Sequence, residues 1–226
     1  SQTPTGFSAD LAADNTYIDI TMSTAVYNAT GGSGALEATD FTLTFAQNSG
    51  SATAASISSV KQNDNTAEAS ATALAGGETV IRIFLSITGT PSGVETITIT
   101  PVDGSSIYDA SDRAMESSQT TGAIALNDKL APTISSVSLA ANNSTIAVTF
   151  SEAVYNTNGG SGALEASDFV FSISGGTATL SNVTPTSVDP SGNVYTLGIG
   201  LSGTSDGTEV LTVNPVDDGI YDANGN

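Results

Sequence analysis

The sequence predicts an all-β protein made of two tandem copies of one sandwich domain. The prediction starts from a long internal repeat and from short runs in which apolar and polar residues alternate, separated by turn-forming clusters. Helical periodicity is scarce, and only residues 162–167 could form a single helical turn. A chain of 226 residues has room for two ordinary domains.

The internal repeat is clearest where AVYNATGGSGALEATDF, residues 25–41, returns as AVYNTNGGSGALEASDF at residues 153–169. A second match relates residues 95–113 to residues 209–226, at an offset that has fallen from 128 to 114 and then 113. The first copy therefore contains about 14 additional residues. We place the repeats at residues 1–128 and 129–226, with the boundary in LNDKLAPT.

The additional residues of the first copy lie between Val60 and Val80. We expect them to lengthen the middle hairpin, roughly Lys61 to Ala75, without altering the core. The physical reason is that the entropic cost of closing a loop grows only logarithmically with its length.

The individual strands follow from the alternating runs. In the second copy they are expected at residues 134–139, 144–151, 169–173, 177–188, 194–201 and 208–214, and in the first copy residues 118–126 predict a seventh. The second copy reaches Asn226 before its own seventh strand, which we interpret as a segment boundary rather than natural termination. About seven short strands in about 100 residues is typical of an immunoglobulin-like β-sandwich.

The core of the second copy is expected to consist of the apolar residues that alternate along its strands. These are Ile146, Val148, Phe150, Phe169, Phe171, Leu197, Ile199 and Leu211.

The charge balance excludes several partners. Four Lys and Arg stand against 23 Asp and Glu, which gives a net charge of −19. A nucleic-acid partner requires basic groups that displace counterions from phosphates, and an anionic membrane surface attracts basic segments. We expect neither nucleic acid nor direct membrane contact, and we expect a monomer.

The absence of two residue types excludes further chemistry. The chain has no His and no Cys, so it can contain no Ser-His-Asp or Cys-His catalytic group, no disulfide and no thiolate metal site. The oxygen ligands that remain are carboxylates, amides, hydroxyls and carbonyls, which hard cations such as calcium prefer.

Acidic residues of the second copy are expected to converge at one end. The alternating strand directions place the end of the second strand, the start of the third and the loop after the sixth together, at the end where the linker arrives. The expected calcium ligands are Asn127, Asp128, Glu152, Asp168, Asp217, Asp222 and Asn224. Clustered carboxylates repel one another unless a cation neutralises them, and calcium takes six to eight oxygens. Taken alone, each of these residues is better explained as an ordinary turn former than as a ligand, and it is their convergence that indicates calcium.

The first copy repeats part of this pattern with Asp40, Asp103, Asp109 and Asp112. Thr24 replaces the glutamate, however, and no preceding linker lies in this sequence. We therefore expect a weaker site there, if the first copy holds an ion.

These motifs resemble bacterial immunoglobulin-like repeats. FSEAVYN at residues 150–156, the Asp-Phe pair at 168–169 and YDANGN at 221–226 resemble the repeats, including SwmB-type modules, found in tandem in large secreted or cell-surface adhesins. LNDKLAPT also resembles the cadherin linker D-x-N-D-x-x-P, whose acidic residues hold calcium. Ala125 stands where the first Asp of that motif belongs, which favours one ion over a cluster of three.

The resemblance implies a non-enzymatic, extracellular stalk segment, stiffened by calcium, whose partners are neighbouring repeats of the same chain. The alternative is a carbohydrate- or protein-binding accessory module. It would be favoured if the unrepeated aromatic residues Phe7, Tyr17, Phe45 and Phe84 lined one open groove. A paired-carboxylate glycosidase would require a cleft with an acid pair.

Overall fold

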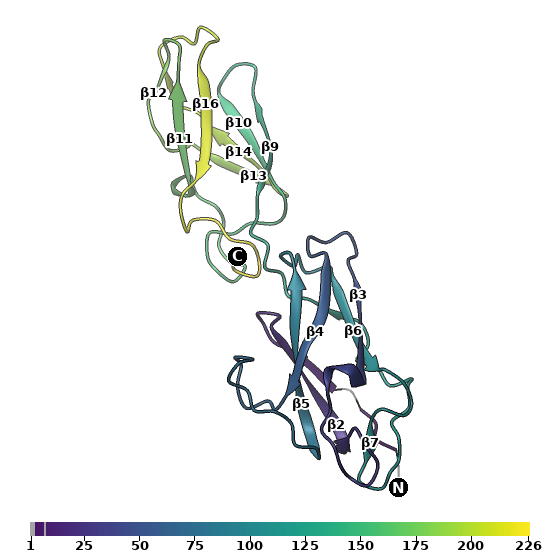
Figure 1. Ribbon diagram of the computed structural model, residues 1–226. Coiled ribbons are helices and arrows are strands. Elements are labelled where there is room, and N and C mark those ends of the chain that lie inside the picture. The colour runs from purple at the N-terminus through teal and green to yellow at the C-terminus, as the bar shows by residue number, and fades with distance from the viewer. Residues whose placement is uncertain (1–2, 7) are drawn as a thin grey trace. The chain divides into compact units, whose positions relative to one another are not determined.

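The computed structural model describes residues 3–6 and 8–226 and divides the chain into two compact units, Ser1–Leu130 and Ala131–Asn226 (Figure 1). Strands make up 43% of the chain and short 3-10 turns 3%, so the predicted all-β class is confirmed. No helix among the described residues has the length and apolar character needed to cross a membrane.

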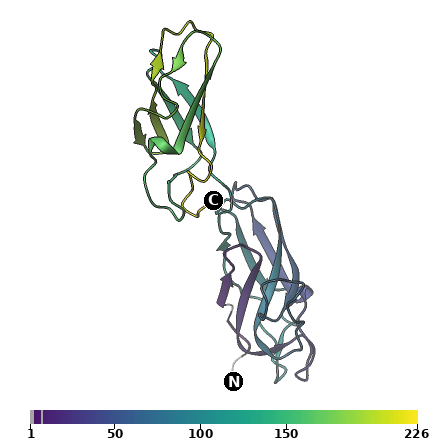
Figure 2. The same cartoon turned by 90° about the vertical axis from the view of Figure 1, so that its left-hand side faces the viewer.

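The first unit consists of two antiparallel sheets. Its elements are β1 (Ser8–Leu11), β2 (Tyr17–Tyr27), η1 (Ala38–Asp40), β3 (Phe41–Ala46), β4 (Ala54–Lys61), β5 (Glu78–Thr88), β6 (Thr96–Pro101), β7 (Tyr108–Asp109) and β8 (Ile124–Ala125). One sheet has the order β1-β2-β5-β4 with β7 also on β2, and the other has the order β3-β6-β8. The two layers can be followed in a side view (Figure 2). The core lies between them and takes Ile18 and Ile81 from one sheet and Ile99 from the other.

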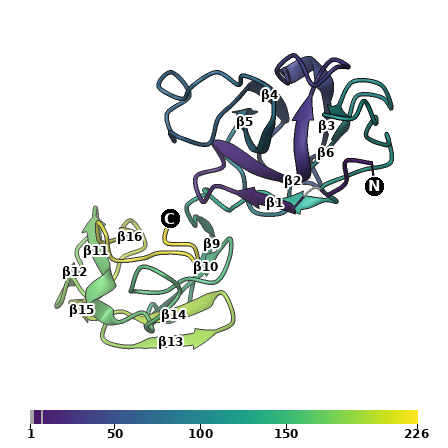
Figure 3. The same cartoon turned by 90° about the horizontal axis from the view of Figure 1, so that it is seen from below.

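The second unit repeats this framework, with shorter counterparts of β2, β4 and β5. Its elements are β9 (Ile134–Leu139), β10 (Thr145–Phe150), η2 (Ala166–Asp168), β11 (Phe169–Ser174), β12 (Thr179–Leu180), β13 (Val188–Ser191), β14 (Val194–Gly198), β15 (Leu201–Ser202) and β16 (Val210–Pro215). One sheet has the order β13-β14-β10-β9, and β11 pairs with β16 in a second (Figure 3). β12 pairs with β15.

The register of the second unit matches that of the first. Ile146 lies opposite Leu139 and Leu197, as Ile18 lies opposite Leu11 and Ile83. Six of the eight predicted core residues are buried, and the other two, Ile199 and Leu211, are partly buried and pack against them. The predicted core is therefore confirmed.

Three predicted strands are shorter than expected. The segment 177–188 is regular only at its two ends, because the Asn182 side chain accepts a hydrogen bond from the Thr184 N–H and Pro185 has no N–H to donate. The segment 194–201 breaks after Gly198. The segment 118–126 forms a strand only at Ile124–Ala125.

The additional residues of the first unit lie in the loop between β4 and β5, as expected. Leu74 of this loop packs against the core, so the loop also contributes to it. The loop also lies over the outer face of the sheet, where the Asn65 carbonyl accepts a hydrogen bond of 2.8 Å from the Arg82 guanidinium.

The outer face beneath this loop carries an ion pair in which the Arg82 side chain is 8% exposed and the Asp19 side chain is 22% exposed. The Arg82 Nε and Nη2 atoms donate to the two carboxylate oxygens of Asp19, each at 2.7 Å, and the guanidinium lies 3.6 Å from the centre of the Tyr17 ring. Asp19 raises the pKa of Arg82 further through hydrogen bonding. The sequence did not single out this pair.

Candidate functional site

Three segments of the second unit meet at the end where its chain begins. The Ser151 N–H, just after β10, donates to the Thr133 carbonyl at 2.8 Å. Tyr155 and Tyr221 exchange two backbone hydrogen bonds of 2.8 Å, which fix the loop after β16 beside the segment after β10. The Val216 N–H donates to the Asp168 carbonyl at 2.9 Å and brings in the start of β11. The acidic residues of these segments therefore share one end of the unit.

Asp222 is the buried member of this acidic end, with 0% of its surface exposed. Its Oδ1 accepts hydrogen bonds from the backbone N–H of Asn224 at 2.8 Å and of Asn226 at 2.9 Å, and its Oδ2 accepts one from the Asn226 amide at 2.8 Å. A carboxylate oxygen of Glu152 lies within 4.8 Å of an oxygen of Asp222. The fold thus holds two carboxylates beside each other, one of them out of water.

No side-chain cation of the second unit can neutralise these two carboxylates, because residues 131–226 contain neither Lys nor Arg. Two unit charges about 5 Å apart repel by about 3 kcal/mol at an effective dielectric constant of about 20. Carboxylate and carbonyl oxygens held in such loops are the ligands of a hard divalent cation. The pair is chemically suited to calcium.

The corresponding end of the first unit has a different charge balance. Asp109 occupies the position of Asp222, is 1% exposed, and accepts hydrogen bonds from the backbone N–H of Ser111 and Arg113 at 2.8 and 3.0 Å. The Arg113 guanidinium forms an ion pair with it and takes the place of the Asn226 amide. Thr24 stands where Glu152 stands in the second copy. An arginine therefore supplies the positive charge at this end.

The pKa of Asp109 shows how Arg113 acts. Burial is the largest single influence and favours the protonated acid, but hydrogen bonds from Arg113 and Ser111, together with the charge of Arg113, outweigh it and hold the pKa below its usual value. The carboxylate is thus stabilised as an anion by its own chain.

Asp40 and Asp168 hold the turns that precede β3 and β11. Asp168 accepts a hydrogen bond of 2.7 Å from the Glu165 N–H, and Asp40 accepts one of 2.8 Å from the Glu37 N–H. Each pair closes a reciprocal capping box around a 3-10 turn. Burial raises the pKa of Asp40.

The other predicted ligands of the two units lie in turns. Asp103 is exposed and accepts hydrogen bonds from Ser105 and Ser106, with the Ser106 hydroxyl contributing most to a lowered pKa. Asp112 accepts a hydrogen bond from the Gly31 N–H. Asp217 and Asn224 are exposed, and the Asn224 N–H donates to Asp222. Within the second unit, Glu152 and Asp222 are the predicted ligands whose carboxylate oxygens meet.

Asn127 and Asp128 follow β8 at the end of the first unit. The Asn127 N–H donates to the Asn15 side-chain oxygen at 2.8 Å, and the Asn15 amide donates to the Asn127 carbonyl at 2.8 Å. The Asp128 carboxylate accepts a hydrogen bond of 2.9 Å from the Leu130 N–H. Asn127 thus fastens the linker to the turn between β1 and β2.

The unrepeated aromatic residues are distributed over two sheets. Phe84 is buried and forms an edge contact with Tyr17 on the five-stranded sheet, whereas Phe45 belongs to the three-stranded sheet. Phe7 lies outside the described residues. These positions provide no support for an aromatic recognition groove among the residues described.

Sequence reasoning missed the role of Arg113, which sets the charge at the Asp109 end of the first unit. Arg113 and Asn226 occupy the last aligned position of the repeat, so comparing side-chain charge position by position would have found the difference.

Comparisons of the chain with known protein families, with curated proteins and with solved structures found no significant match.

Proposed function

We propose that this chain is a non-catalytic spacer, a stalk segment of a secreted or cell-surface bacterial adhesin whose second repeat binds calcium. The observation that supports a spacer most directly is the path of the chain through the first unit. Thr5 and Ser23 exchange hydrogen bonds of 2.8 Å where the chain comes in, and Asn127 is bonded to Asn15 where it leaves. The chain takes eight residue steps from Asn15 to Ser23, mostly along β2, which span roughly 25 Å when extended.

The second unit repeats the incoming contact. The Thr133 N–H donates to the Ser151 hydroxyl at 2.9 Å, and the Ser151 N–H donates back to the Thr133 carbonyl at 2.8 Å. Modules that receive the chain at one end and release it at the other extend a protein each time they are repeated. This property suits a stalk built of immunoglobulin-like repeats.

Calcium would act at the acidic end of the second unit. Glu152 and Asp222 provide two carboxylates there, and no Lys or Arg of residues 131–226 competes with a cation. Asp128, three residues before that unit begins, is the linker ligand that the sequence predicts. An ion held by both linker and loop would restrict the hinge between the repeats.

The test is thermal melting and small-angle X-ray scattering of the full chain, in calcium and in EDTA at matched ionic strength. At a dissociation constant of ~10⁻⁴ M, as in other extracellular modules, ~10 mM calcium would stabilise the folded form by about 2.7 kcal/mol. Chelation should lower the melting temperature and broaden the distribution of interdomain distances. Asp128→Ala or Glu152→Ala should reproduce most of that loss, whereas Thr24→Ala should have little effect. Identical curves with and without calcium would overturn the proposal.

A further inference from the structure

The sequence contains two Asn-Gly pairs, and both belong to the second repeat. They are Asn158-Gly159, in the glycine-rich loop after β10, and Asn224-Gly225, in the loop after β16. In the first repeat, Thr30-Gly31 and Ser111-Asp112 stand at these positions. Asparagine is prone to lose its side-chain amide when glycine follows it, because glycine has no side chain that shields the backbone nitrogen beside the amide.

The two pairs pack against each other. The Asn158 side-chain amide donates a long hydrogen bond of 3.5 Å to the Gly225 carbonyl. Only glycine fits at residue 225, because the Cβ of any other residue there would lie 2.3 Å from the Asn158 Oδ1. The Asn158 amide therefore adds a contact between the same two loops that Tyr155 and Tyr221 join through their backbones.

The backbone nitrogen of Gly159 is open to reaction. Asn158 and Gly159 are both exposed, and beyond the neighbouring residues no atom lies within 4 Å of the place that a Cβ on Gly159 would occupy. In the first repeat the carboxylate of Asp112 accepts a hydrogen bond from the Gly31 N–H. Gly225 stands at the position of Asp112, and among the described residues the Gly159 N–H has no protein acceptor. This nitrogen can therefore lose its proton more easily than its counterpart in the first repeat.

The backbone nitrogen of Gly225 is held more tightly. Its N–H donates to the Asp222 carbonyl at 3.4 Å. The N–H groups of Asn224 and Asn226, on either side of it, donate to the Asp222 carboxylate at 2.8 and 2.9 Å. These bonds restrain the turn, and the buried carboxylate opposes a second negative charge on the Gly225 nitrogen. Asn224 should therefore react more slowly than Asn158, although glycine follows both.

We propose that Asn158 is a deamidation site, at which the second repeat acquires a carboxylate without an enzyme. The Gly159 nitrogen gives its proton to hydroxide and attacks the Asn158 Cγ, which closes a succinimide ring. The Cγ–Nδ2 bond breaks, and the amide nitrogen takes a proton from water and leaves as ammonia. Water then opens the ring at one of its two carbonyls. Opening at Cγ yields aspartate, and opening at the backbone carbonyl yields isoaspartate, in which the chain runs through Cγ.

Deamidation removes the contact between the two loops. The Asn158 amide donates to the Gly225 carbonyl, whereas a carboxylate can only accept, so that two oxygens would face each other. The reaction also adds one negative charge to the end of the unit that holds Glu152 and Asp222. The glycine-rich loop after β10 loosens as a result.

The test incubates the full chain at mildly alkaline pH in oxygen-labelled water and maps its peptides by mass spectrometry after digestion with pepsin in acid. Asn158 should gain labelled oxygen at a rate proportional to the hydroxide concentration, with isoaspartate among the products. It should react roughly fivefold faster than Asn224, the ratio that one hydrogen bond of about 1 kcal/mol provides. In urea, which removes the turn around Asp222, the two rates should become similar. Equal rates in the folded protein, or no label at Asn158, would overturn the proposal.

Two variants separate the site from its consequence. Asn158→Thr gives the loop the residue of the first repeat and should abolish labelling at this position while the protein stays folded. Asn158→Asp carries the carboxylate from the start and should speed amide exchange at Thr157, whose N–H donates to the Ser161 carbonyl at 3.1 Å. Ala29 forms the same bond in the first unit, also of 3.1 Å, and should exchange as before. Unchanged exchange at Thr157 would overturn the loosening of the loop.

Discussion

Asp109 and Asp222 hold the same position in the two units and receive the same two backbone hydrogen bonds, yet their neighbours differ in charge. The first unit places Arg113 on the carboxylate and a threonine at the facing position. The second places a neutral asparagine there and a glutamate nearby. The same loop is thus built with an arginine on the buried carboxylate in the first unit and with a neutral asparagine in the second.

A second contrast lies on the outer face of the larger sheet. Tyr17, Asp19 and Arg82 of the first unit correspond to Thr145, Ala147 and Thr196 of the second. The first unit covers this face with its long β4–β5 loop, whereas β13 and β14 are joined by a tight turn. The added loop and the ion pair are linked structurally, because the Asn65 carbonyl of the loop accepts a hydrogen bond from the Arg82 guanidinium.

The largest effect is expected from breaking this ion pair. Asp19→Ala leaves a nearly buried guanidinium without its carboxylate and should destabilise the first unit by about 3 kcal/mol. The double variant Asp19→Ala with Arg82→Thr gives the first unit the residues of the second. It should be more stable than Asp19→Ala alone, as measured by urea unfolding. If the single and double variants were equally stable, the unpaired guanidinium beneath the loop would not be the cause of the destabilisation.

Shortening the β4–β5 loop is expected to have a smaller effect. Replacing residues 62–77 with a tight turn removes the burial of Leu74, worth about 1–2 kcal/mol. Shorter loops close more easily, but each halving of length gains only about 0.6 kcal/mol. The variant should therefore fold and be slightly less stable. A more stable variant would show that the loop adds nothing to the core.

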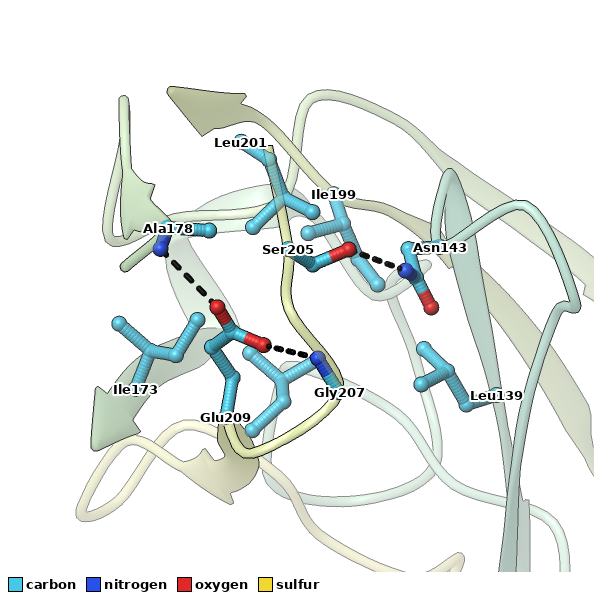
Figure 4. Close-up of a pocket in the computed structure, with 10 residues that line it drawn as sticks. Leu139, Asn143, Ile173, Ala178, Ile199, Leu201, Ser205, Gly207 and Glu209 are labelled. Atoms are coloured by element: carbon cyan, nitrogen blue, oxygen red, sulfur yellow. Dashed lines mark hydrogen bonds between the residues drawn. The ribbon is translucent and has the colours of Figure 1, made fainter. Parts of the chain in front are cut away.

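Acid should destabilise the two units to a similar degree at Glu95 and Glu209, which lie at the end of each unit opposite Asp109 and Asp222. Hydrogen bonds from backbone N–H groups, with that of Ala178 the largest contributor, lower the pKa of Glu209 to about 2 from an ordinary 4.5 (Figure 4). Because the folded-state pKa is depressed, the stabilisation is complete above about pH 4.5 and is lost as the pH falls toward 2. Burial opposes ionisation of Glu95, yet hydrogen bonds from Ala52 and Ser92 lower its pKa as well.

The measurement is urea unfolding at pH 6 and pH 2.5 of the native chain, Glu209→Gln and Glu95→Gln. Each variant should be less stable than the native chain at pH 6, and the difference should shrink at pH 2.5. A difference that does not change with pH would assign the stabilisation to packing rather than to the charge.

Much of the fold follows from residue patterns that the sequence displays. The period-two runs such as Ile146-Ala-Val-Thr-Phe150 predicted both the strands and the buried face. The strand breaks at Pro185 and after Gly198 were harder to predict, because they depend on side-chain hydrogen bonds and local turns. The alternation of apolar and polar residues does not show where the hydrogen bonding between two strands is interrupted.

The acidic end could be predicted only in part. Strand direction predicted that segments after β10 and β16 would meet, and Glu152 and Asp222 do meet. Strand direction does not predict where a side chain points. The Asp168 side chain points back to its own turn, where it caps the 3-10 turn by accepting a hydrogen bond from the Glu165 N–H. The difference between Arg113 and Asn226 is visible in the aligned repeats. Its effect on the charge of the site became clear only from the ion pair between Arg113 and Asp109 in the structure.

The most direct test of the contrast between the units exchanges their charges and measures calcium binding by isothermal titration calorimetry. The native chain should bind calcium with a dissociation constant of ~10⁻⁴ M. Glu152→Thr with Asn226→Arg gives the second unit the residues of the first, and should abolish that binding while the protein stays folded. No calcium binding by the native chain, or unchanged binding after the exchange, would contradict the account.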